Sequence, residues 1–249
     1  MPCGGSKCLE AAAICYLGSV DESVAQLVEH RPFKALVLGS SPSALTIKSI
    51  TYLPMHPSPE PTSASTARLN SPLAGYSVFG PRAGYSPQIS ILVSQLDWMR
   101  QSVLMRLHDL TRADLDWLPS PDGNTVGALL LHLAASETYY QFHTFDGLPW
   151  ATTSPETKKR FGPAMRLGDL GRRLVRNHDL PFYLDTLAEV RERTLNELRK
   201  RDDVWLMSVD KNWFWGPTNN LCKWFHICEH ESHHLGQIDL HLKSIRLRR

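Results

Sequence analysis

Two histidines in the carboxyl-terminal part of the chain have the spacing of metal ligands. His230 and His234 lie four residues apart in a segment with helical periodicity. Side chains with this spacing project from one face of an α-helix, about one turn apart. Because two imidazoles in that arrangement can bind one ion, the segment predicts a metal site.

The same residues formally match the zinc-protease pattern H-E-x-x-H, in which Glu231 would be the general base. The extended form of that pattern requires a glycine and a histidine at positions that Gln237 and Leu240 occupy in this chain. The protease interpretation therefore lacks its third ligand. We expect the third ligand to come from an upstream segment.

Six upstream or neighbouring histidines could supply that ligand. His132 is the strongest because it lies inside the apolar run 128–135, at a position that core packing would normally give to leucine. A single buried histidine is more often a core residue satisfied by one hydrogen bond. The histidine pair elsewhere in the same predicted bundle favours the ligand role for His132. The remaining candidates are the carboxylates together with His108, His143, His178, His226 and His241.

Three neutral imidazoles that leave one coordination position open are typical of catalytic rather than structural metal sites. Such a site accepts one divalent ion, and Zn, Ni, Fe and Mn bind it with differing affinity. Glu231 is a candidate for a hydrogen bond to a ligand imidazole in preference to a base role. Glu137 should turn away from His132 and take part in packing or an ion pair.

Other side chains near the predicted site are weaker candidates. His233 points about 100° from His234 on a helix and is expected at the surface or rim. His241 shares the face of His234 but lies two turns away, too far to share the ion. Five aromatic residues could line a substrate pocket, although such residues are more often part of the core. They are Tyr139, Tyr140, Trp213, Phe214 and Trp215.

The elements that must position these residues are four long amphipathic helices, because apolar residues recur at three- and four-residue steps. The predicted helices cover about 87–109, 124–145, 181–201 and 218–246. The connection 146–179 contains several prolines and is expected to hold at most a short helix around 166–175. No segment alternates as a strand would, so the fold class is an all-α bundle.

Composition and charge exclude several classes of protein. The chain has 249 residues and 42% hydrophobic content, enough for a sizeable core. Its net charge of +2 provides no strong field for nucleic acid or a membrane surface. Five cysteines without a C-x-x-C pair suit a reducing compartment, and no apolar run approaches the ~20 residues that span a bilayer. We expect a cytoplasmic protein that binds neither nucleic acid nor membrane.

Residues 1–86 differ in character from the predicted bundle domain, 87–249. They are rich in Ser, Pro, Gly and Ala and lack an amphipathic period, so we expect a disordered extension. Residues 24–46 also resemble the translation of a transfer-RNA gene, with Val24–His30 matching a D-arm and Leu38–Ser43 a T-arm. This resemblance favours a misplaced start codon, and a genuine disordered leader is the alternative.

The segment from about 87 to 246 resembles the DinB-like family, which is related to the DUF664 group and to bacterial thiol-dependent transferases. The resemblance implies that His132, His230 and His234 are the metal ligands of an up-down-down-up four-helix bundle. Leu235 stands where many relatives have an arginine. The residues that carry the resemblance are Asp114-Leu115-Asp116-Trp117, 119–125, Leu131-His132-Leu133-Ala134-Ala135-Ser136-Glu137, Trp224-Phe225-His226 and 230–238.

The family resemblance also implies a function at the metal. Its better-understood branches use a low-molecular-weight thiol such as bacillithiol or mycothiol, because a metal ion stabilises the strongly nucleophilic thiolate. We therefore expect a metal-dependent thiol transferase that acts on a small-molecule substrate. The alternatives are a metal-dependent hydrolase that uses bound hydroxide and a non-catalytic metal-binding module of a stress response. The chain could also form a homodimer.

Overall fold

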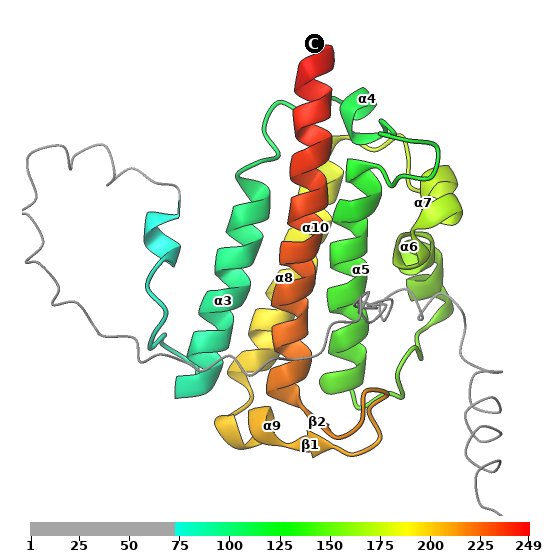
Figure 1. Ribbon diagram of the computed structural model, residues 1–249. Coiled ribbons are helices and arrows are strands. Elements are labelled where there is room, and N and C mark those ends of the chain that lie inside the picture. Colours follow the sequence, from blue (N-terminus) through cyan, green and yellow to red (C-terminus); the bar gives the residue numbers. More distant parts are fainter. Residues whose placement is uncertain (1–72) are drawn as a thin grey trace, which may run out of the picture.

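The computed structural model describes residues 73–249, and four long helices form its body (Figure 1). In Figure 1, α3 and α10 run upward and α5 and α8 run downward, which gives the order up-down-down-up. This confirms the predicted all-α four-helix bundle. The helices are α3 (Pro87–Leu104), α5 (Val126–Thr144), α8 (Leu180–Arg199) and α10 (Asn220–Arg248).

The interior of the bundle is filled by two groups of buried apolar side chains. One group surrounds Leu129 and Ile238, and the other surrounds Leu92 and Trp224. Helix α10 packs against α3 and α5, and α5 also packs against α8, whereas the neighbouring helices α3 and α8 make little direct contact. Helix α5 is buried along most of its length. A polar side chain on α5 is therefore surrounded by closely packed protein and shielded from water.

Side-chain caps fix where the two histidine-bearing helices begin. The side chain of Thr125 accepts a hydrogen bond from the backbone N–H of Ala128 at 3.0 Å, at the start of α5. The side chain of Asn219 accepts one from the backbone N–H of Cys222 at 2.9 Å, at the start of α10. Because such caps satisfy backbone donors that the helix leaves free, they define the first residue and the register of both helices.

The structure shortens one predicted helix and adds another. Helix α3 ends at Leu104 instead of about 109. The connection 146–179 contains α6 (Pro155–Arg166) as well as α7 (Gly168–Leu174), which matches the expected short helix. Pro155 occupies the first turn of α6, where its missing N–H costs nothing. Pro163 lies inside α6, so the two prolines that indicated a loop are part of a helix.

The remaining elements are short, with two to five residues each. A pair of two-residue strands, β1 (Val209–Asp210) and β2 (Thr218–Asn219), is antiparallel and was not predicted. We call the segment between them, residues 211–217, the aromatic loop. The other short elements are η2 (Ala74–Tyr76), α4 (Arg112–Leu115) and α9 (Asp203–Met207).

The last part of the predicted extension, residues 73–86, lies beside α3 (Figure 1). The ring of Phe79 meets the ring of Trp98 edge-on at 6.3 Å between centroids, and Arg82 pairs with Asp97. The predictions for residues 1–72, including the resemblance to a transfer-RNA gene, fall outside the described residues. In the described part, no helix has the length and apolar character needed to cross a bilayer.

Candidate metal centre

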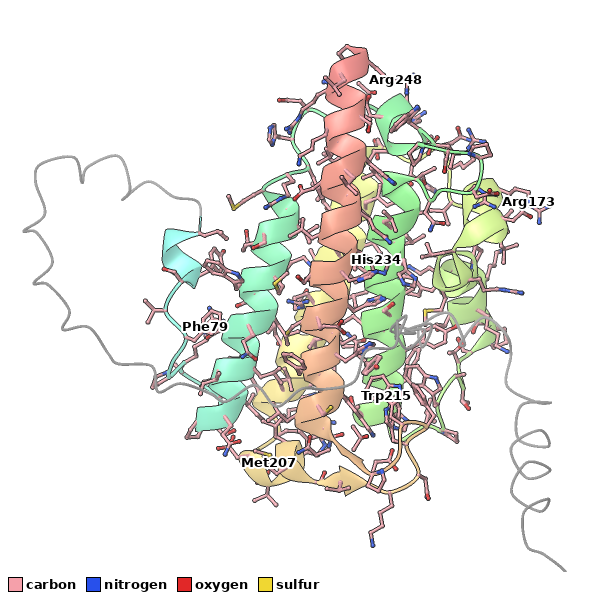
Figure 2. All side chains as sticks on the ribbon, viewed as in Figure 1. Phe79, Arg173, Met207, Trp215, His234 and Arg248 are labelled. Carbon is pink, nitrogen blue, oxygen red and sulfur yellow. The ribbon has the colours of Figure 1, made fainter. Side chains whose placement is uncertain are left out.

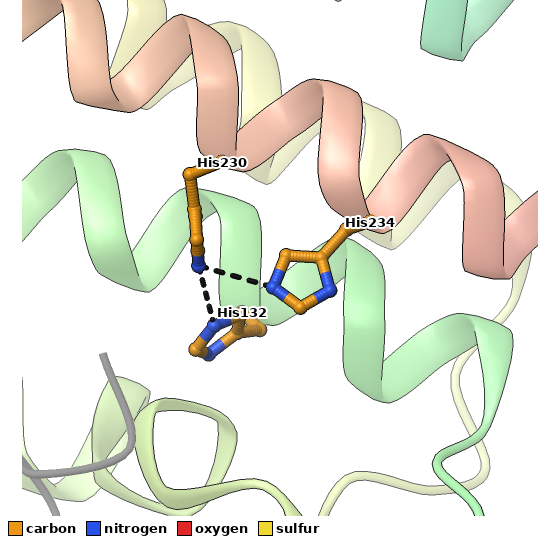
Figure 3. Close-up of side chains that lie close together, drawn as sticks. All are labelled: His132, His230 and His234. Carbon is orange, nitrogen blue, oxygen red and sulfur yellow. Dashed lines mark hydrogen bonds between the residues drawn. The ribbon is translucent and has the colours of Figure 1, made fainter. Parts of the chain in front are cut away.

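Three imidazoles from two helices meet inside the bundle (Figure 3). His132 lies on α5, and His230 and His234 lie one turn apart on α10. The Nε2 atom of His230 is 3.1 Å from Nε2 of His132 and 3.0 Å from Nε2 of His234. Three nitrogen ligands around one tetrahedral zinc ion stand about 3.3 Å apart, given Zn–N bonds of about 2.0–2.1 Å. These two spacings are close to that value, and all three ligand atoms lie within 4.8 Å of one another, so the group could hold a single ion.

Hydrogen bonds at the far nitrogen orient two of the three rings. Nδ1 of His132 lies 2.9 Å from the carbonyl oxygen of Ala164, and Nδ1 of His234 lies 2.8 Å from Oε1 of Gln237. Since an oxygen of this kind only accepts, each Nδ1 carries the proton and each Nε2 keeps a lone pair. Proteins commonly fix the tautomer of metal-binding histidines in this way.

The resulting donor set fits an ion better than it fits hydrogen bonding among the rings. With Nε2 of His132 and His234 both acting as acceptors, one proton on Nε2 of His230 would have to serve both. A divalent ion accepts all three lone pairs together. These three histidines, the predicted ligands, form a group of potential ligand atoms that all lie within 4.8 Å of one another.

Helix α6 supplies the acceptor that orients His132. Because this helix was not predicted from the sequence, the contact was not predicted either. Ala164 lies in the last turn of α6, and its carbonyl oxygen accepts a hydrogen bond from the backbone N–H of Leu167 at 3.2 Å. Because a carbonyl oxygen has two lone pairs, it can also accept from the imidazole. Gln237 could have been identified from sequence, since it follows His234 by three residues on the same helix and thus lies within reach.

Burial keeps the three imidazoles uncharged. Burial lowers the pKa of His132 to about 3, with a further contribution from His234. Burial likewise lowers the pKa of His234 to about 4 and holds the pKa of His230 well below its ordinary value. All three rings are therefore neutral near pH 7, which is the form that binds a metal.

The metal-free protein is expected to lose stability as the pH falls below about 6.5. The unfolded chain takes up protons at the ordinary histidine pKa, whereas the folded protein resists protonation of His132 and His234 until about pH 4. The unfolded state therefore binds more protons between these values, so the free energy of unfolding rises with pH across this window and levels off above it. Denaturant unfolding of chelator-treated protein at pH 5 and pH 7 measures the effect.

Two matched variants test the cause. His132→Gln should reduce the difference in unfolding free energy between pH 5 and pH 7. His233→Gln, at an exposed neighbouring position, should preserve that difference. Equal unfolding free energies at pH 5 and pH 7 in the parent protein would contradict the assignment of neutral buried rings.

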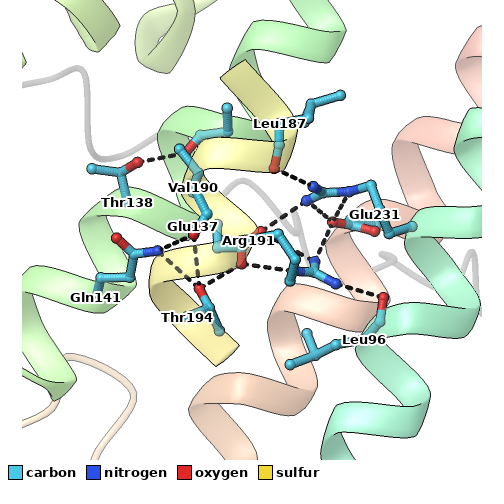
Figure 4. Close-up of polar contacts among 11 residues, drawn as sticks. Leu96, Glu137, Thr138, Gln141, Leu187, Val190, Arg191, Thr194 and Glu231 are labelled. Atoms are coloured by element: carbon cyan, nitrogen blue, oxygen red, sulfur yellow. Dashed lines mark hydrogen bonds and ion pairs between the residues drawn. The ribbon is translucent and has the colours of Figure 1, made fainter. Parts of the chain in front are cut away.

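One charged residue from each long helix meets in the interior beside these histidines (Figure 4). Arg100 of α3 and Arg191 of α8 face Glu137 of α5 and Glu231 of α10, and all four are buried. Arg100 Nη2 lies 2.8 Å from Glu137 Oε2 and 2.5 Å from Glu231 Oε1. Arg191 lies 2.8 Å from Glu137 and 2.9 Å from Glu231. We call these residues the charge cluster; its two positive and two negative charges balance.

The two arginines also join α3 to α8, the neighbouring helices with the least direct contact. Arg100 Nη1 donates to the carbonyl oxygen of Leu187 on α8 at 2.8 Å, and Arg191 Nη1 donates to that of Leu96 on α3 at 2.7 Å. Burial by itself would raise the pKa of Glu137, but Arg191 and Arg100 outweigh it and hold the pKa at about 2. Glu137 is therefore ionised across the physiological range.

The charge cluster decides the roles of the two glutamates. The ion pairs of Glu137 confirm its predicted structural role. The expectation that Glu231 hydrogen-bonds a ligand imidazole is not met, because its Oε1 accepts from Arg100 and Arg191 instead. Its Oε2 is buried and has no partner among the described residues. The buried arginines were not recognised in the sequence, although a charged residue on an apolar helix face was a visible indication.

The other histidines stand outside this group of three. His226 lies one turn before His230, with ring centroids 5.7 Å apart, and its Nδ1 is 2.8 Å from the hydroxyl of Tyr140. His233 is exposed, as predicted, whereas His241 is buried. The alternatives for the third ligand that the structure places elsewhere are His108, His143, His178, His226 and His241.

The region that contains the three histidines matches a known protein family. A family model described as the DinB superfamily matches residues 95–238, which include all three of them. No curated protein matches the chain. A solved structure to which the chain is similar is described as a conserved protein from Enterococcus faecalis. It is 20% identical, the similarity covers 61% of this chain and 94% of that chain, and the TM-score is 0.48.

Proposed function

Because the chain belongs to the DinB superfamily, we propose that it binds one divalent metal ion through His132, His230 and His234 and uses a low-molecular-weight thiol as co-substrate. The observation that carries the proposal is the convergence of three imidazole Nε2 atoms. Zn, Ni, Fe and Mn are all compatible with three imidazole ligands. The thiol and its transfer rest on the resemblance to thiol-dependent transferases.

The chain's own residues would prepare the site for this chemistry. Ala164 and Gln237 fix the tautomers of two ligands, so little reorganisation is needed when an ion binds. The charge cluster connects the four helices one residue beyond His230 and thus holds the two histidine-bearing helices together. When bound, a divalent ion with an open position stabilises the deprotonated form of a thiol at neutral pH.

The surroundings of the histidines favour a thiol over water as the nucleophile. A metal hydrolase of the H-E-x-x-H type uses a carboxylate as the base for water. Glu231 holds the corresponding place in the sequence, but it is engaged by Arg100 and Arg191. A thiol is much more acidic than water and ionises on a metal without such a base. Metal-dependent hydrolysis and a metal-binding module without turnover are the competing functions.

Cobalt(II)-loaded full-length protein is expected to change its visible spectrum when bacillithiol or mycothiol is added. A sulfur ligand entering the open position produces an intense sulfur-to-cobalt absorption, which an oxygen ligand does not. The band should saturate at one thiol per chain. His230→Ala should abolish the band, and His233→Ala, at an exposed position of the same helix, should retain it.

Two other outcomes identify the competing functions. Loaded protein that shows no band with either thiol but hydrolyses 4-nitrophenyl acetate would support the hydrolase. Loaded protein that does neither would support the metal-binding module without turnover.

A further inference from the structure

The aromatic loop, residues 211–217, presents two half-exposed rings at the end of the bundle where α10 begins. Trp213 is 3% exposed, whereas Phe214 and Trp215 are 42% and 41% exposed. Figure 2 shows Trp215 at this end of the molecule. The rings touch one another, with centroids 4.3 Å apart for Trp213 and Phe214 and 5.2 Å apart for Phe214 and Trp215. They form a continuous aromatic surface.

This surface is connected to the candidate metal centre by two ring contacts. The ring of Trp215 lies 4.9 Å from that of His226, at an interplanar angle of 76°. The ring of His226 lies 5.7 Å from that of the ligand His230. A group that rests on Trp215 would therefore be one intervening ring, that of His226, away from His230.

Buried polar contacts hold the aromatic loop in place. Lys223 of α10 is 1% exposed, and its Nζ lies 2.8 Å from Oδ2 of Asp210 at the end of β1. The same Nζ lies 2.9 Å from Nε2 of His143 on α5 and 4.5 Å from the centre of the Trp213 ring. The loop is thus fixed to both histidine-bearing helices, and a site that is already ordered binds with a smaller entropic cost.

The wall behind the exposed rings contains hydrogen-bond donors without acceptors. The indole N–H groups of Trp150 and Trp213 are buried and have no partner among the described residues. The two rings lie 4.8 Å apart, and Trp150 is also 5.5 Å from Phe214. Single exposed apolar side chains are ordinary, but two adjacent rings backed by unmet donors indicate a ligand that is both aromatic and hydrogen-bond accepting.

We propose that the aromatic loop, together with Trp150 and His226, binds the electrophilic co-substrate through a planar conjugated group that carries carbonyl or nitro oxygens. The faces of Phe214 and Trp215 receive the conjugated plane, and the oxygens meet the indole donors. The proposal names the substrate class for the metal-dependent thiol transfer and rests on that function. It places the electrophile at the end of the bundle where α10 begins, with the ring of His226 between Trp215 and His230.

The probe that tests the aromatic site is 1,3-dinitrobenzene, which has the plane and the oxygens but no leaving group. Its binding to full-length, metal-loaded protein is followed by quenching of tryptophan fluorescence. Trp215→Ala should raise the dissociation constant about tenfold, and Trp215→Phe should raise it less because a ring remains. The matched control is Phe225→Ala on α10, a more exposed ring outside the loop, which should leave it unchanged. The isosteric hydrocarbon 1,3-dimethylbenzene should compete only weakly.

The metal content of each variant separates this proposal from the proposed function. If Trp215→Ala keeps its ion and binds the probe as the parent does, or if Phe225→Ala weakens binding equally, the aromatic site is wrong while metal binding stands. If the hydrocarbon competes as well as the dinitro compound, the role of the indole donors is wrong. Failure of the parent protein to hold an ion would instead overturn the proposed function.

Discussion

Replacement of Arg191 by alanine is expected to lower the free energy of unfolding by about 3–5 kcal/mol, the cost of breaking a buried ion pair. The variant removes the partner of two buried carboxylates, Glu137 and Glu231, which then share only Arg100. It also removes the hydrogen bond from α8 to the carbonyl oxygen of Leu96 on α3. Denaturant unfolding followed by circular dichroism measures the loss.

The matched control is Arg173→Ala. Arg173 forms a surface pair with Asp169, in which both side chains are largely exposed, and such a pair contributes less than about 1 kcal/mol. A second variant, Arg191→Met, retains volume and separates the loss of charge from the loss of packing. If Arg191→Ala costs no more than Arg173→Ala, the charge cluster does not hold the four helices together.

The four long helices could be predicted because their apolar residues repeat at three- and four-residue steps. The boundaries of α5 and α10 were close to the observed ones, and Thr125, which caps α5, is a residue type that favours this position. Helix α6 was missed because Pro155 and Pro163 were interpreted as loop residues. Proline ends or starts a helix depending on position, and sequence periodicity was too weak to decide.

The histidine site was predictable for a related reason. The spacing of His230 and His234 is a property of one helix, and His132 is conspicuous in an apolar run. The orienting contact of His132 with Ala164 was not predictable, because it depends on how α6 packs against α5. Local spacing therefore reveals ligands, whereas the groups that orient them depend on tertiary structure.

The charge cluster and the aromatic loop could not be predicted from short sequence patterns. Each of the four helices contributes one member of the cluster, and no two of the four are close in sequence. A buried arginine needs ionic partners, and those of Arg100 and Arg191 come from other helices. Their role is therefore apparent only in the folded chain. The strands that carry the aromatic loop have two residues each, too few to produce an alternating pattern.

Replacement of any one of His132, His230 or His234 by alanine is expected to weaken metal binding by more than about 100-fold. Loss of a group that merely orients a ligand costs about 10–100-fold, and loss of a ligand itself costs more because the site then offers only two lone pairs. Circular dichroism establishes that each variant remains folded. His233→Ala is the control, since this exposed side chain neighbours His234 on the same helix.

The central claim is tested most directly by elemental analysis of the purified full-length protein and of these four variants, loaded with a divalent ion under identical conditions. We predict about one ion per chain in the parent protein and in His233→Ala, and almost none in the three ligand variants. A parent protein without a bound ion, or folded His132→Ala that keeps the parent's metal content, would contradict a metal centre formed by these three histidines.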